Sequence, residues 1–199
     1  SGCGKSTFLR ILAGLEKPDD GEVLLNGKKL VNTGPDRIMV FQEGALFPWL
    51  TVEDNVEYGL KVAGIPENER HDISKRYLDM MQLSQFANSY TYQLSTGMKQ
   101  RVAIARALVM DPDVLLMDEP FAALDVMTIK TLQEIIVGLQ STSKISVILC
   151  DHQARDLLAC VDSAAIIHNG KVVAQGTPSS LIQNIDAQNA YFGDSFKIS

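Results

Sequence analysis

The 199-residue sequence has few of the features that mark several common classes of protein. No uninterrupted apolar run approaches the roughly 18 residues that a membrane-spanning helix needs, and the first residues lack the charged-then-apolar pattern of a secretory leader. We therefore expect a cytoplasmic protein. Basic residues are scattered through an acidic chain of net charge −6, so no nucleic-acid partner is expected. The three cysteines, Cys3, Cys150 and Cys160, have neither metal nor redox spacing, which argues against a disulfide framework.

What is present fits one globular domain, because 46% of the residues are hydrophobic and 21% are charged. Apolar residues at helical spacing predict helices over about 8–15, 51–64, 95–111, 126–139 and 153–159. Short apolar runs predict strands within 21–30, 37–42, 114–117, 146–150, 164–168 and 171–174. This alternation is typical of an α/β protein with a parallel sheet.

The heptapeptide SGCGKST at residues 1–7 matches the second half of the phosphate-binding loop G-x-x-x-x-G-K-[ST]. Gly2 and Gly4 let backbone amides turn toward an anion, Lys5 can reach the outer phosphates, and Ser6 can offer a hydroxyl to Mg²⁺. The ligand should therefore be a nucleoside triphosphate. Taken alone, the same residues could form an ordinary glycine turn. The residues expected to bind the nucleotide in this loop are Gly2, Cys3, Gly4, Lys5, Ser6 and Thr7.

Two carboxylates follow the apolar run VLLM at residues 114–117. A metal-assisted phosphoryl transfer needs one carboxylate near Mg²⁺ and another near an attacking water. We assign Asp118 to the metal and Glu119 to the base. In isolation the Asp-Glu pair could equally be a solvated turn, but it directly follows a strand that is expected to be buried.

The stretches GCGKST, LSTGMKQR (94–101), LLMDEP (115–120) and AALD (122–125), together with Gln42 and His152, resemble the nucleotide-binding ATPase subunits of ABC transporters. This resemblance implies a P-loop NTPase fold with a RecA-like α/β core, part of an antiparallel β subdomain and a helical subdomain at about 43–104. All 199 residues would belong to one such domain, without its N-terminal part. It further implies a head-to-tail dimer that encloses two ATP molecules, docked to an integral membrane permease on the cytoplasmic face of the inner membrane.

By the same resemblance, several residues take specific roles. Gln42 would contact Mg²⁺ and report the nucleotide state, and His152 would hold the γ-phosphate and the water. Ser95 and Gly97 would contact the γ-phosphate held by the other copy, and Asp125 would touch that copy. Considered singly, Gln42 reads as a surface glutamine and His152 as the cap of a strand end.

The chain departs from the family pattern within the signature, at Thr96 and Met98, and upstream of the phosphate loop. Thr96 stands where the signature L-S-G-G-Q has glycine, which leads to the hypothesis of slower hydrolysis. Family members also carry about forty residues before the phosphate loop, including a core strand. We therefore expect the chain as given to be a fragment with impaired ATP binding.

The identity of the cargo stays open between two readings. Residues 44–64 and 94–125 resemble importers of nitrate, sulfonates and taurine, whereas 152–182 and the ending 191–199 resemble the ATPase of lipopolysaccharide export. Leu46, Phe47, Pro48 and Trp49 form either a docking patch for the permease or part of the core of the helical subdomain. An ABC ATPase without a membrane partner and an ordinary P-loop kinase are the rival classes.

Overall fold

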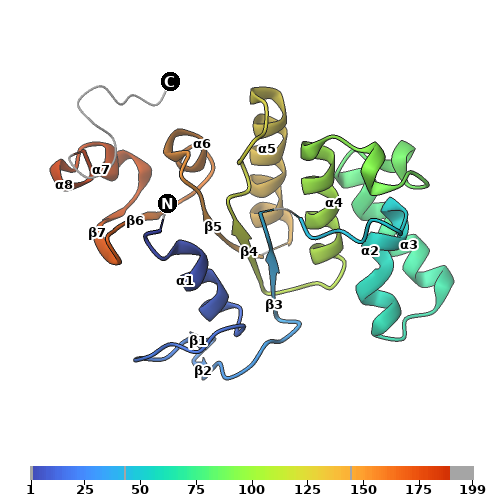
Figure 1. Ribbon diagram of the computed structural model, residues 1–199, viewed down its shortest axis with the longest axis horizontal. Coiled ribbons are helices and arrows are strands. Elements are labelled where there is room, and N and C mark those ends of the chain that lie inside the picture. The colour runs from blue at the N-terminus through green and yellow to red at the C-terminus, as the bar shows by residue number, and fades with distance from the viewer. Residues whose placement is uncertain (1, 43, 144, 189–199) are drawn as a thin grey trace.

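The computed structural model describes residues 2–42, 44–143 and 145–188, with the backbone alone described at 142, 143 and 186 (Figure 1). The α-helices are α1 (Lys5–Leu12), α2 (Val52–Val62), α3 (Glu67–Met80), α4 (Thr96–Leu108), α5 (Val126–Ser143), α6 (Ala154–Leu158), α7 (Pro178–Ile182) and α8 (Ile185–Ala187). Two short 3₁₀ helices are η1 (Ser84–Phe86) and η2 (Thr91–Gln93). The strands are β1 (Leu24–Leu25), β2 (Lys28–Lys29), β3 (Arg37–Val40), β4 (Val114–Asp118), β5 (Ser146–Cys150), β6 (Ala164–His168) and β7 (Lys171–Gly176). Within the described residues, no helix is both long and apolar enough to span a membrane.

The central sheet has the order β3-β4-β5, and both pairings are parallel. β4 lies in the middle, with Leu115 opposite Ile38 of β3 and Val147 of β5. A central parallel strand is covered on both faces, and β4 is accordingly apolar without interruption from Val114 to Met117. The strands expected at 37–42, 114–117 and 146–150 are confirmed.

Successive side chains of β4 point to opposite faces of the sheet, as they must in a strand. Leu115 and Met117 join a large buried cluster with α4 and α5. Leu116 instead packs with Leu9 and Ala13 at α1, in a much smaller cluster. The result is a three-layer α/β arrangement, with α1 on one face and α4 and α5 on the other.

Helices α2 and α3 lie at one end of the molecule, beside α4 (Figure 1). α2 begins where the sequence predicts, because the Thr51 hydroxyl accepts a hydrogen bond from the Asp54 amide and the Asp54 carboxylate accepts one from the Thr51 amide. α4 likewise begins after Ser95, whose hydroxyl accepts from the amide of Met98 at 3.3 Å. The stretch expected to be helical, 43–104, contains α2, α3, both 3₁₀ helices and the first part of α4; residue 43 lies outside the described residues.

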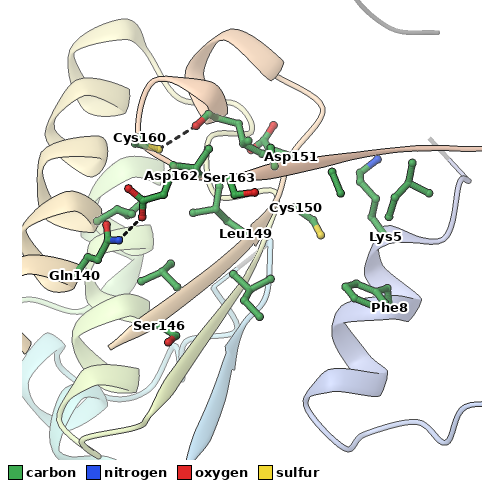
Figure 2. A pocket seen from close by; sticks show the side chains of 18 of the residues that line it. Lys5, Phe8, Gln140, Ser146, Leu149, Cys150, Asp151, Cys160, Asp162 and Ser163 are labelled. Carbon is green, nitrogen blue, oxygen red and sulfur yellow. Dashed lines mark hydrogen bonds between the residues drawn. The ribbon is translucent and has the colours of Figure 1, made fainter. Parts of the chain in front are cut away.

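The last two strands do not join the parallel sheet, although their place after an α/β alternation is typical of one. β6 and β7 pair with each other, antiparallel, as a separate two-stranded sheet. A cavity of about 550 Å³ lies between β5 and β6, and Lys5 and Phe8 of α1 contribute to its lining (Figure 2). Strand alternation cannot reveal this separation, because pairing depends on neighbours that are distant in sequence. The ending 191–199, on which the exporter reading partly depends, lies outside the described residues.

Candidate active site

Three of the residues singled out from the sequence meet at the carboxyl ends of the parallel strands. Gln42 follows β3, Glu119 follows β4 and His152 follows β5. Oε2 of Glu119 accepts a hydrogen bond from Nε2 of Gln42 at 3.0 Å and lies 3.5 Å from Nδ1 of His152. The carboxyl edge of an open α/β sheet is the place where ligands bind in this class of fold. One carboxylate therefore connects three consecutive strands of the sheet.

The backbone holds Glu119 in an unusual conformation. Its φ is +49°, in the left-handed region that costs a residue other than glycine about 1–2 kcal/mol. Its amide donates to the carbonyl of Cys150 at 2.7 Å, which continues the β4–β5 pairing one residue beyond Asp118. The strand thus ends with the Glu119 side chain directed toward Gln42 and His152. Strain of this kind at a polar site is typical of a functional position.

Asp151 is a residue of the site that sequence reasoning missed. Its side chain is fully buried, Oδ2 accepts from the amide of Phe121 at 2.9 Å, and Oδ1 accepts from the amide of Gln153 at 2.8 Å. The Gln153 side chain returns a hydrogen bond to the carbonyl of Phe121 at 3.0 Å. Asp151 therefore joins the loop that carries Glu119 to the loop that carries His152. A signal was available, because the carboxylate directly precedes His152 at the end of a strand.

Asp118 ends β4 as a buried carboxylate, and its Oδ1 has no hydrogen-bond partner among the described residues. An orphaned buried oxygen of this kind is costly unless a cation or another donor compensates it. Mg²⁺ prefers oxygen ligands, and Asp118, Ser6 and Gln42 all offer oxygen. The residues present therefore fit a magnesium ion.

The phosphate loop leads directly into α1. Gly2 and Gly4 have φ values of +62° and +94°, and a Cβ on either would meet open space. Nζ of Lys5 donates to Sγ of Cys3 at 3.3 Å, and Ser6 and Thr7 lie in the first turn of α1. Both glycines are thus required by backbone conformation rather than by packing. Ser1 lies outside the described residues.

Lys5, Asp151 and His152 line one pocket of about 190 Å³. Cys150, the partner of Asp118 across the β4–β5 pair, lines the 550 Å³ cavity together with Lys5 and Asp151. Burial raises the pKa of the Cys150 thiol to about 11, with a further increase from the Asp118 charge and a decrease from Lys5. Figure 2 shows Lys5 on α1 across the larger cavity from Cys150. The phosphate loop and the carboxylates therefore converge.

Ser95, Gly97 and Asp125 form a second group, apart from the first. Ser95 caps α4, Gly97 lies buried in its first turn, and Asp125 precedes α5 as an exposed carboxylate. Gly97 and Asp125 are joined through Thr128. α1, which carries the phosphate loop, packs on the other face of the sheet. The structure therefore places these three residues in a group separate from the one around Glu119.

Comparisons with known proteins identify the family. The model of the ABC transporter family matches residues 1–122. The chain belongs to the ABC transporter family. It is 46% identical over 181 residues to an ABC transporter ATP-binding protein of Methanocaldococcus jannaschii, covering 91% of this chain and 65% of that protein.

Two relatives have named cargo. The nitrate import ATP-binding protein NrtD of Synechocystis is 46% identical to this chain, over 78% of the length of this chain and 59% of the length of NrtD. The taurine import ATP-binding protein TauB of Pseudomonas aeruginosa is 40% identical over 93% of this chain and 68% of its own. The chain thus spans about two thirds of the length of these curated relatives.

Solved structures of ABC proteins share the fold. CbiO1 of Clostridium perfringens, part of the ABC transporter complex cbiONQ, superposes with a TM-score of 0.85 at 29% identity, over 95% of this chain and 78% of its own. The ATP-binding cassette MJ0796 was solved as a dimer in a post-hydrolysis state, bound to ADP and Pi. It superposes with a TM-score of 0.80 at 32% identity, over 89% of this chain and 82% of its own. The expected α/β P-loop NTPase fold is confirmed.

Proposed function

We propose that the protein binds and hydrolyses ATP as the nucleotide-binding subunit of an ABC transporter on the cytoplasmic face of a membrane. The observation that carries this proposal is the Glu119 carboxylate, which lies within reach of both Gln42 and His152 beside the orphaned Asp118 oxygen. Catalysis of phosphoryl transfer depends chiefly on positioning the reacting groups and stabilising the phosphate charge, and these residues can do both. The ADP and Pi in the similar cassette support the choice of ligand.

In this mechanism the loop amides around Gly2 and Gly4 and the ammonium of Lys5 bind the β- and γ-phosphates. Asp118, Ser6 and Gln42 would hold Mg²⁺, which would neutralise phosphate charge. Cys3 and Thr7 complete the loop and the start of α1. The half-buried loop thus supplies the positive side of the site, opposite the carboxylates of β4.

Glu119 orients the attacking water and takes up its proton. Its Oε2 is already hydrogen-bonded to Gln42, so a movement of Gln42 would also move the base. His152, with its side chain half exposed, is placed to hold the γ-phosphate and the water. The hydrogen bonds of Asp151 to the amides of Phe121 and Gln153 help to position the loops that carry Glu119 and His152.

The group of Ser95, Gly97 and Asp125 implies a second copy of the chain. Ser95 and Gly97 would contact the γ-phosphate bound to the loop of the partner, and Asp125 would touch the partner itself. The dimeric state of the similar cassette supports this head-to-tail arrangement. ATP would then join the two copies, and its hydrolysis would release them.

An apolar patch beside α2 is the proposed docking site for the permease. Trp49 is 70% exposed, and Phe47 contacts both Trp49 and Tyr58, with ring centroids 5.7 Å and 4.5 Å apart. Arg106 lies over the Phe47 ring at 5.5 Å, beside a pocket of about 310 Å³. An exposed aromatic cluster next to a pocket suits an inserted helix from a membrane subunit. The exposure of Trp49 favours docking over the alternative that it belongs to the core.

For the cargo we propose a small anion such as nitrate or a sulfonate, taken up by import. The names of the relatives from Synechocystis and Pseudomonas aeruginosa support this choice. They favour import over the alternatives of lipopolysaccharide export and a function without a membrane partner. The permease would select the anion, so this subunit supplies energy rather than specificity.

The substitution Glu119→Gln, made in the complete natural protein, tests the proposed ATPase activity. Phosphate release should fall about 10²–10⁴-fold, because the base is lost, while the affinity for ATP stays the same. Glu134→Gln, at an exposed glutamate of α5, is the matched control and should keep full turnover. Turnover at the wild-type rate in Glu119→Gln would overturn the role of Glu119, and a wild-type protein without ATP hydrolysis would overturn the proposed function.

A further inference from the structure

The N-terminus of α5 is closed by Asp125 in a way that uses both carboxylate oxygens. Oδ1 accepts from the amides of Met127 and Thr128 at 3.0 and 3.1 Å. Oδ2 accepts from the hydroxyl of Thr128 at 2.6 Å. The Thr128 hydrogen bonds lower the pKa of Asp125, so the group is held as a carboxylate. The side chain of Thr128 therefore fixes the orientation of an otherwise exposed residue.

The other branch of Thr128 reaches α4. A Cβ on Gly97 would collide with the γ-methyl of Thr128 and would lie 3.3 Å from both its Cβ and its Oγ1. Gly97 is helical, so its backbone conformation does not demand glycine. What demands glycine is the close approach of Thr128. The methyl therefore sets the distance between the first turns of α4 and α5.

We propose that Thr128 is a positioning residue that couples Asp125 to the Ser95–Gly97 turn within one chain, its hydroxyl holding the carboxylate and its methyl holding the helix. This inference rests on the proposed function, in which both segments act on the second copy and its nucleotide. A displacement of α4 is then transmitted to Asp125 through a single side chain. Thr128 acts through Asp125 and Gly97 and touches no nucleotide itself.

Two substitutions of Thr128 of similar size test its contacts with Asp125 and Gly97 separately. Both are made in the complete natural protein. Thr128→Val keeps a γ-methyl and loses the hydrogen bond to Asp125. Thr128→Ser keeps the hydroxyl and loses the methyl that meets Gly97. Thr131→Val is the matched control, because the Thr131 hydroxyl bonds the carbonyl of Met127, one turn back along the same helix.

We expect kcat for ATP hydrolysis to fall about tenfold in Thr128→Val, the factor that corresponds to one charge-assisted hydrogen bond. Thr128→Ser should lose about threefold, since a methyl contact contributes less than the hydrogen bond does. The KM for ATP and the midpoint of thermal unfolding should stay near wild type in both, because the phosphate loop and the core are untouched. Thr131→Val should keep kcat within about twofold, because its backbone hydrogen bond lies outside both groups of site residues.

ATP-dependent dimer formation, measured by light scattering in the Glu119→Gln background, supplies the second readout. Adding Thr128→Val should raise the ATP concentration needed for dimer formation by a similar factor of about ten. Values of kcat and dimerisation within twofold of wild type in both Thr128 variants would overturn the inference, as would a loss that appears in KM alone. A wild-type protein that neither hydrolyses ATP nor dimerises would instead overturn the proposed function, so the two failures are distinguishable.

Discussion

The two faces of the central sheet differ in how firmly they are packed. On the face of Leu115 the sheet, α4 and α5 form one buried cluster that continues into α2 and α3. On the face of Leu116 the corresponding cluster contains Leu9 and Ala13 of the α1 region, next to the 550 Å³ cavity. The carboxylates of the site thus stand on a closely packed base, while the phosphate loop rests on a thin layer. Ligand binding should therefore order the loop side more than the carboxylate side.

The largest predicted effect comes from two adjacent leucines of β4 that are fully buried on opposite faces. Leu115→Ala should lower the free energy of unfolding by about 4–5 kcal/mol, because it leaves a cavity that the packed helices cannot fill. Leu116→Ala should cost about 2–3 kcal/mol, since α1 can settle toward the sheet. Urea unfolding followed by circular dichroism measures both losses.

The same pair also tests the link to the ligand. Leu116→Ala should weaken ATP binding, because Leu116 supports the helix that carries Lys5, whereas Leu115→Ala should leave the affinity unchanged. Isothermal calorimetry at a temperature where both variants are folded makes the comparison. Equal losses of stability, or equal losses of affinity, would mean that the two faces do not differ as described.

Thiol chemistry gives a second test of the two faces. Burial raises the pKa of Cys150, on the α1 face, and of Cys160, in the main cluster, to about 11 in each case. At pH 8 only about one thiol in a thousand is then ionised, so both should react with maleimide far more slowly than an ordinary thiol. Raising the pH toward 11 should increase the rate about tenfold per unit. Cys150 should respond first, because it is only half-buried whereas Cys160 is buried.

Cys3 supplies the contrast, since it is half-buried in the phosphate loop. Maleimide at pH 8 should label Cys3 before the other two cysteines, and ATP should protect it. Mass spectrometry of digested protein follows each site, and Cys3→Ser is the control in which rapid labelling disappears. Rapid labelling of Cys160 at pH 8 would contradict the packing assigned to the main cluster.

The smallest predicted effect concerns Thr96, the exposed first residue of α4. If its Cβ hinders the phosphate of the second copy, Thr96→Gly should raise kcat by less than about tenfold, a gain below about 1.4 kcal/mol. Because the Thr96 side chain is exposed, the unfolding midpoint should change little. Steady-state phosphate release decides the matter, and equal turnover in the two proteins would end the hypothesis of slower hydrolysis.

Local signals allowed most of the fold to be predicted. The Thr51 capping box, the Ser95 cap and the unbroken apolar run of β4 each depend on residues that are close in sequence, and each appears where expected. The separate β6–β7 pair was not predictable in this way, because an apolar run does not specify its partner.

The candidate site shows the same division. Motif residues such as Glu119 and His152 were found by their order along the chain, and the parallel strands bring them together. Asp151 and Thr128 escaped notice because their importance lies in contacts with Phe121 and Gly97, about thirty residues away in each case. The contact of Thr128 has no local signature, and Asp151 offers only one local signal, its position directly before His152.

The strict alternation of β4 also limits how the length of the chain can change. Removing or adding one residue between Val114 and Met117 would turn every following side chain to the opposite layer, and Asp118 would face the wrong side. Such an indel should be lethal to the fold. An extra residue in the exposed turn at 63–64, between α2 and α3, should in contrast be accepted, so natural length variation should gather there.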